Sequence, residues 1–126
     1  MKLSILFTIN AVVATLFGLA FLIIPAPALA QYGLTADSVT AVMSRFFASA
    51  LLGYGILAWY ARNAEDSPAR QAIVIAYFVS NVIGFVVALQ TQFTTEVNQL
   101  GWLTVVIYLF FAVGYGYFQF AKPKEV

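Results

Sequence analysis

The sequence contains no cysteine and no histidine. Without cysteine the chain can form no disulfide, no thiolate metal site and no thiol redox centre. Without histidine it lacks the commonest haem ligand, the usual zinc ligand and the usual general base. From these absences we expect no bound cofactor and no metal.

Charge is also scarce. Only 9% of the 126 residues are charged and 63% are hydrophobic, whereas soluble domains are roughly 25% charged. So little charge cannot cover a water-exposed surface, which indicates that lipid is the solvent. The net charge of +1 offers no basic patch for nucleic acid. The length fits one domain, spanning residues 1–126.

Long hydrophobic runs are what the sequence does have. A helix needs about 20 apolar residues to cross the hydrocarbon layer, and lipid-exposed backbone must be helical to pair its polar groups. The sequence therefore predicts an all-α integral membrane protein, an antiparallel four-helix bundle with spans at Leu3–Ile24, Val39–Ala61, Ala69–Leu89 and Leu100–Phe120.

The first run has a second interpretation. Lys2, the apolar stretch and the small residues Ala28 to Ala30 resemble a signal peptide with its cleavage site. The run from Leu3 to Ile24 is longer than the roughly 7–15 residues of a signal peptide core and suits a full span. We therefore expect it to be retained as the first helix.

Basic residues predict the orientation. Lys and Arg collect in cytoplasmic loops, and the connectors 25–38 and 90–99 contain none. Both termini are therefore expected in the cytoplasm, with the basic residues Lys2, Arg62, Arg70, Lys122 and Lys124 on that side. Aromatic residues typical of membrane interfaces agree, with Trp59, Tyr60, Tyr115, Tyr117 and Phe120 near the cytoplasmic face and Tyr32, Phe93 and Trp102 near the outer one.

Local signals predict where the helices begin and end. Pro25 and Pro27 forbid continuation of the first helix. Asp37 or Ser38 can cap the second helix, and Ser67 followed by Pro68 has the pattern of a cap and a first helical position.

Small residues recur every fourth position along the third predicted helix and predict close helix packing. Two interpretations stay open, contacts inside a self-contained bundle or docking against another subunit. The residues of this ridge are Ala72, Ala76, Ser80, Gly84 and Ala88.

Arg45 is the one basic residue inside a span, about 9 Å below the outer boundary at 1.5 Å per residue. A guanidinium at this depth is costly. Because Ala41, Ala48 and Ser49 share its side of the helix, we expect Arg45 to face the bundle. Counting helical rise places Thr15, Asn81 and Tyr108 at nearly the same level.

This coincidence suggests a central polar layer in which Arg45 donates to oxygens of Asn81, Thr15 and Tyr108. Three interpretations compete: a network that fixes helix register, an outward-opening anion or headgroup site, and an Arg45 that extends to the interface and pairs with Asp37 or Glu96. Arg45→Leu separates them, because unchanged folding and function would eliminate the first two. Asn10 is expected to bond a neighbouring helix or, alternatively, a ligand.

No carboxylate lies within a predicted span, which disfavours a proton-coupled carrier. No nucleophile is paired with a base and no phosphate-binding loop is present, so we do not expect an enzyme.

The run Arg45-Phe-Phe-Ala48-Ser-Ala-Leu-Leu-Gly53-Tyr-Gly55 resembles a motif of the small bacterial DoxX-like membrane proteins, as do the Pro-ended first helix and Gly101-Trp102. The resemblance implies a four-helix protein of the bacterial inner membrane, with some relatives linked to oxidoreductase complexes. Arg45 and Gly53 carry over as motif positions, Gly53 in helix packing. We expect a non-catalytic accessory or assembly subunit that contacts lipids and other subunits or further copies. The alternative is a binder of lipid or small anions through Arg45.

Overall fold

The computed structural model describes residues 2–94 and 97–121. Four of its helices are long and apolar enough to cross a membrane, so the predicted all-α, four-span fold is confirmed and the protein is a multi-pass membrane protein. The described elements are α1 (Leu3–Ile23), α2 (Pro25–Gln31), α3 (Ser38–Ala61), α4 (Pro68–Thr94), α5 (Gly101–Gly116) and a π-helical turn, η1 (Tyr117–Ala121), that continues α5.

The short helix α2 was not predicted. The first span does end before Pro25, as expected, but Pro25 then occupies the first turn of α2. Proline suits that position, because its fixed φ is helical and its missing N–H would have no partner there. After α2 the chain reverses at Gly33, whose φ of 77° is sterically easy only for glycine.

The expected caps are present. The Asp37 carboxylate accepts a hydrogen bond of 2.7 Å from the Thr40 amide at the start of α3. The Ser67 hydroxyl accepts one of 3.2 Å from the Arg70 amide at the start of α4. At its other end α4 continues past the predicted Leu89 to Thr94, since loss of hydropathy marks where lipid ends and does not stop a helix.

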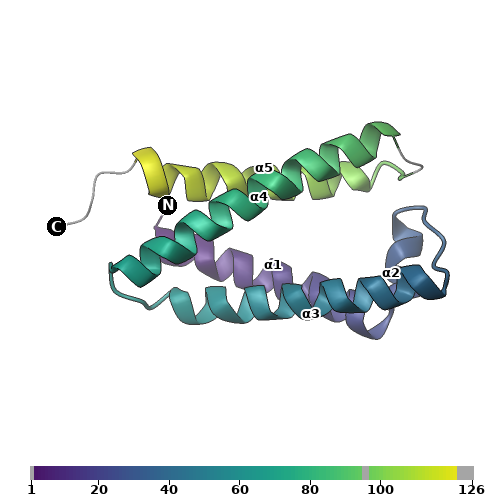
Figure 1. The fold of residues 1–126 in the computed structure, drawn as a ribbon, viewed down its shortest axis with the longest axis horizontal. Coiled ribbons are helices and arrows are strands. Elements are labelled where there is room, and N and C mark those ends of the chain that lie inside the picture. Colours follow the sequence, from purple (N-terminus) through teal and green to yellow (C-terminus); the bar gives the residue numbers. More distant parts are fainter. Residues whose placement is uncertain (1, 95–96, 122–126) are drawn as a thin grey trace.

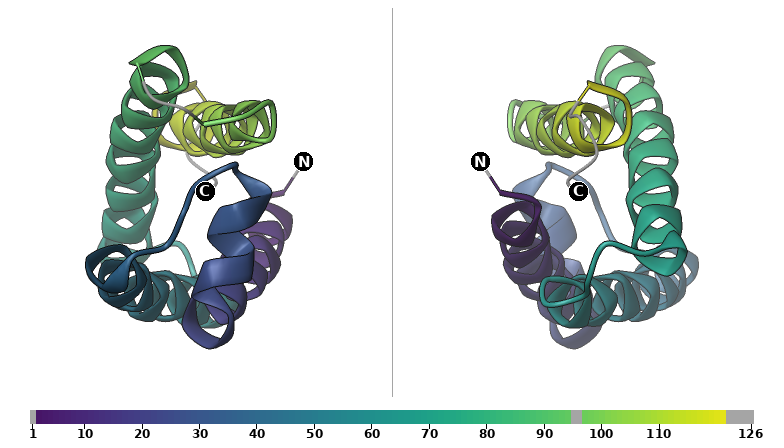
Figure 2. Two further views of the ribbon diagram at one scale, coloured as in Figure 1. Left: turned by 90° about the vertical axis from the view of Figure 1, so that its right-hand side faces the viewer. Right: turned by 90° about the vertical axis from the view of Figure 1, so that its left-hand side faces the viewer.

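The four spans form two antiparallel pairs. α1 packs along α3, and α4 packs along α5. Figures 1 and 2 show α4 inclined to the other spans, close to α3 at the end that holds the N-terminus and beside α5 at the end that holds α2. The pairs therefore converge at one end, the predicted cytoplasmic one, and diverge at the other.

Small side chains bring α1 and α3 close together. Ala11, Ala14 and Gly18 on α1 and Ala48, Gly55 and Ala58 on α3 are all buried. A Cβ on Gly55 would lie 3.3 Å from the Ala11 carbonyl oxygen and 3.0 Å from the Thr15 hydroxyl. The two backbones therefore approach as in small-residue membrane interfaces, where van der Waals contact holds the helices together.

Hydrogen bonds join the two pairs at the diverging end. The Asn98 amide donates to the Tyr32 carbonyl at 2.9 Å, and its side chain donates to the Gln31 carbonyl, also at 2.9 Å. The hydroxyls of Tyr32 and Thr104 are 2.8 Å apart. These bonds connect the end of α2 and the adjacent Tyr32 to the connector before α5 and to its first turn.

Candidate functional site

Five polar side chains meet between the spans where the two pairs converge. We call them the Tyr–Asn cluster, and every membrane span contributes at least one member: Asn10 from α1, Tyr54 from α3, Tyr77 and Asn81 from α4, and Tyr115 from α5. Asn10, Tyr77, Asn81 and Tyr115 are buried and Tyr54 is partly buried.

Hydrogen bonds link the cluster across helices. The Asn10 amide donates to the Tyr115 hydroxyl at 2.8 Å. The Asn81 amide donates to the Tyr54 hydroxyl at 2.6 Å and to the Tyr77 carbonyl at 2.7 Å. The Tyr77 hydroxyl donates to the Tyr54 carbonyl at 2.5 Å. These bonds join α1 to α5 and α3 to α4, and the ring contact between Tyr77 and Tyr115 brings the two sets together.

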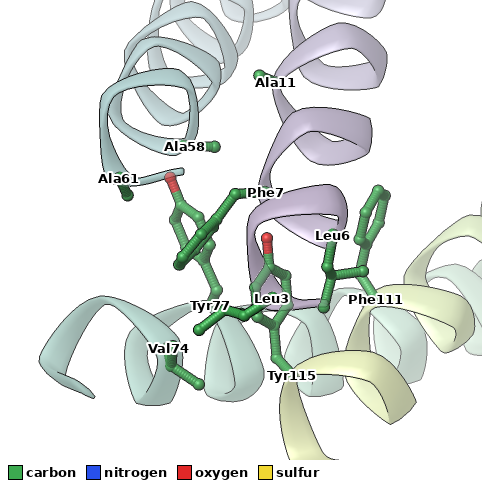
Figure 3. Packing of buried hydrophobic residues seen from close by; sticks show 10 residues of the cluster. All are labelled: Leu3, Leu6, Phe7, Ala11, Ala58, Ala61, Val74, Tyr77, Phe111 and Tyr115. Carbon is green, nitrogen blue, oxygen red and sulfur yellow. The ribbon is translucent and has the colours of Figure 1, made fainter. Parts of the chain in front are cut away.

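Aromatic rings pack around these bonds. The Tyr54 and Tyr77 ring centroids are 4.0 Å apart, and those of Tyr77 and Tyr115 are 5.2 Å apart. Figure 3 shows Tyr77 reaching from α4 to the end of α3 beside Ala58 and Ala61, with the Phe7 ring next to it. α4 thus contacts α3 here through long side chains rather than by close backbone packing.

The chemistry of the Tyr–Asn cluster is hydrogen bonding. Its members are amides and phenols. The cluster contains no carboxylate, imidazole or thiolate, which are the side chains that most often bind metal ions in proteins. Buried polar networks of this kind fix the register of neighbouring helices. Among residues 2–94 and 97–121, no three acidic, histidine or cysteine side chains are grouped to hold a metal ion.

Arg45 is not part of this network, and the expectation that it faces the bundle is wrong. Its side chain is exposed. Nine residues, or 2.5 helical turns, separate it from Tyr54, so the two lie on opposite sides of α3. Of the small residues near it, Ala48 is buried whereas Ser49 is exposed. Arg45 therefore lies at the lipid-facing rim of the contact between α1 and α3.

The predicted polar layer is consequently not formed. Asn81 bonds to Tyr54, and no hydrogen bond joins Arg45 to Thr15, Asn81 or Tyr108 within the described residues. Thr15 is half-buried beside Gly55, and Tyr108 is half-buried against Gly84. Equal height along antiparallel helices did not bring these side chains to the same side. Glu96, one of the suggested partners of Arg45, lies outside the described residues, as do Lys122 and Lys124.

Asn10 bonds to a neighbouring helix, as expected. Sequence reasoning placed Tyr115 at the membrane interface and did not select Tyr54 or Tyr77. The available signal was the position of Tyr54 and Tyr77 well inside hydrophobic runs, because a buried tyrosine needs a hydrogen-bond partner for its hydroxyl.

The small-residue ridge of α4 is divided. A Cβ on Gly84 would lie 2.3 Å from the Tyr108 ring, so this end packs tightly on α5, and Ala88 is half-buried. Ala72, Ala76 and Ser80 are exposed. Four residues advance about 40° beyond a full turn, so the ridge winds round α4 and cannot face one neighbour along its length.

Gly53 does not pack against a helix. Nothing lies within 4 Å of the position that its Cβ would take. The glycine that permits close packing on α3 is Gly55, two positions further along the same motif.

One family model matches residues 1–118 of the chain, and its description is a domain of unknown function (DUF8292). The chain belongs to the DUF8292 family. No curated protein and no solved structure matches it.

The DUF8292 match covers all four spans except the end of η1. It therefore includes both the Tyr–Asn cluster in the interior and Arg45 on the outside. Both are polar features of this DUF8292 protein that need an explanation in a membrane.

Proposed function

We propose that this protein is a non-catalytic accessory or assembly subunit of a larger membrane complex, and that the Arg45 side of α3 contacts a partner. One observation carries the proposal: a permanent cation projects outward from a membrane span. On insertion scales an arginine costs about 2.5–3.5 kcal/mol at the bilayer centre and somewhat less at the depth of Arg45, about 9 Å inside the outer boundary. A polar or acidic group on another polypeptide would offset that cost.

The exposed part of the α4 ridge supports the same proposal. Only 17% of the most apolar stretch of α4 is buried, the smallest share of the four spans. Ala72, Ala76 and Ser80 leave the backbone of α4 accessible to another helix. The DoxX-like motif led by Arg45 is in keeping with a bacterial inner-membrane protein whose termini lie in the cytoplasm, and we propose that location and orientation.

A second candidate function is binding of a lipid or a small anion through Arg45. It is favoured by the depth of Arg45, about 9 Å inside the outer boundary, from which a long side chain can reach headgroup phosphates. In that case the exposed guanidinium would hold a phosphate rather than another subunit.

Purification of the tagged protein in mild detergent separates the two, with Arg45→Leu as the test variant. Because leucine suits a lipid-facing position better than arginine, Arg45→Leu should leave the isolated protein folded. We expect the wild type to carry another polypeptide at a fixed ratio and Arg45→Leu to lose at least about tenfold of it, or about 1.4 kcal/mol.

A photo-crosslinking residue at Ser49, one turn from Arg45 on the same side, gives an independent measurement. The matched control is Val113, which is exposed on α5. Crosslinks to one defined protein from position 49 but not from position 113 would support the subunit function. Crosslinks to lipid alone at position 49, with phosphate-bearing lipid lost in Arg45→Leu, would replace it by the second candidate.

A further inference from the structure

A groove runs along the outside of the α1 and α3 pair. Its volume is about 480 Å³, within the roughly 300–1,000 Å³ typical of ligand sites. Buried Ala11 and Gly55 form its floor, and the exposed side chains of Val12, Leu16 and Ile56 form its sides. The floor is low because Gly55 has no side chain and α3 lies close to α1.

Aromatic side chains and a cation lie at one end of the groove. Trp59 and Tyr60 are exposed and line it there. The Arg62 guanidinium lies 3.5 Å from the centre of the Trp59 ring, and its Nη1 donates to the Trp59 carbonyl. The ring and one carbonyl hold the guanidinium in place without neutralising its charge.

We propose that this groove binds one acyl chain of an anionic phospholipid, with the phosphate at Arg62. Six residues separate Ile56 from Arg62, a rise of about 9 Å, so a chain lying against Ile56 and Leu16 would place its headgroup near the guanidinium. Tryptophan and tyrosine favour this headgroup level. The predicted cytoplasmic location of Arg62 places the site in the leaflet that carries anionic lipid.

A lipid chain fits the groove better than a helix from another protein. The Arg62 guanidinium lies against Trp59, which lines one end of the groove, so the apolar groove and the neighbouring cation match the acyl chain and the phosphate of one lipid molecule. Ile56 lies on the same side of α3 as Arg45, since 11 residues turn the helix by only about 20° beyond three full turns, but about 16 Å further along it. The lipid site does not depend on the proposed subunit function.

Native mass spectrometry of the full-length protein tests the site, with phosphatidylglycerol and phosphatidylcholine of equal chain length as probes. Val12→Phe fills the groove, and Val106→Phe is its control because Val106 is similarly exposed on α5. Arg62→Gln removes the cation, and Lys2→Gln is the control for net charge. Both test positions are at the surface or at a helix end, and circular dichroism verifies folding.

The wild type should retain one phosphatidylglycerol in preference to phosphatidylcholine. We expect Val12→Phe to reduce retention of both lipids about tenfold, and Arg62→Gln to reduce the preference about fivefold, the effect of about 1 kcal/mol per basic residue. The two controls should match the wild type. Equal retention of both lipids by the wild type, equal losses in Val12→Phe and Val106→Phe, or crosslinks from position 12 to a second protein would each overturn the proposal.

Discussion

At the scale of single residues, polar side chains inside a membrane span have opposite roles in this protein. Asn10 and Asn81 are buried and bonded to tyrosines of other helices, whereas Arg45 faces outward. The sequence identified all three as unusual. The sequence could not show which of the three faces the interior of the bundle. Helical periodicity tells which residues share a side of a helix, but a helix in lipid has no polar side that marks the lipid-facing surface.

Replacement of Asn81 tests the Tyr–Asn cluster. We expect Asn81→Leu to lower the free energy of unfolding by about 0.6–1.7 kcal/mol, because it removes an interhelical hydrogen bond to Tyr54. Titration with a denaturing detergent measures the change. Asn63→Leu is the control, since Asn63 is exposed in the connector between α3 and α4. Equal effects of the two substitutions would show that the cluster bond contributes nothing.

The cap of α3 should be visible in a pH titration. The hydrogen bond from Thr40 holds the pKa of the Asp37 carboxyl below its ordinary value of 3.8. A lowered pKa means that the cap contributes stability above pH 3.8 and loses it as the pH falls through the lower, folded-state value. NMR should show the Asp37 carboxyl and the Thr40 amide titrating together below 3.8. In Asp37→Asn the amide shift should no longer titrate there. A midpoint at or above 3.8 would contradict the cap.

At the scale of helices, the spacing of small residues decides which elements approach closely. The sequence predicted the four spans and two caps from hydropathy and cap residues. It did not predict α2, because Pro25 was interpreted only as a helix stop and not as a first helical residue. It also emphasised the ridge of α4, although a period of four drifts around a helix, and it overlooked the closer contact of Gly55 with Ala11.

Two glycines of α3 provide a matched test. Gly55→Leu must displace α1, because even a Cβ there would be 3.3 Å from the Ala11 carbonyl. Overpacking of this kind costs about 1–3 kcal/mol. Gly53→Leu points into open space and should change the free energy of unfolding by less than about 0.5 kcal/mol. Detergent denaturation of both variants checks this pair. A larger loss for Gly53→Leu would mean that α3 is rotated from the orientation described above.

At the scale of the whole molecule, two helix pairs are joined by polar contacts at both ends. The Tyr–Asn cluster holds them where they converge, and Asn98 and Tyr32 connect them where they diverge. Much apolar side-chain surface stays exposed on all four spans, as expected for a chain whose solvent is lipid. Arg45 differs from these exposed apolar side chains because it is charged, and this difference suggests a partner.

Reporter fusions in living cells test the orientation. A reporter enzyme active only outside the cytoplasm should be inactive when inserted near Glu65, in the connector between α3 and α4, and active when inserted near Thr35. The reason is the placement of Arg62 and Arg70 around the first site and the lack of basic residues around the second. Activity near Glu65 would mean that the orientation is the opposite of the predicted one and that the proposed lipid site lies in the outer leaflet.

The outward position of the Arg45 side, and its contact with a partner, can be measured with spin labels. The chain has no cysteine of its own, so Ser49→Cys and Ala48→Cys each give one label on adjacent residues, of which Ser49 is exposed and Ala48 is fully buried. In vesicles that contain only this protein, the label at 49 should collide freely with dissolved oxygen and the label at 48 should not. In native membranes the label at 49 should become shielded. Shielding at 49 in both preparations would place this side inside the bundle, and free collision at 49 in both would leave Arg45 without a protein partner.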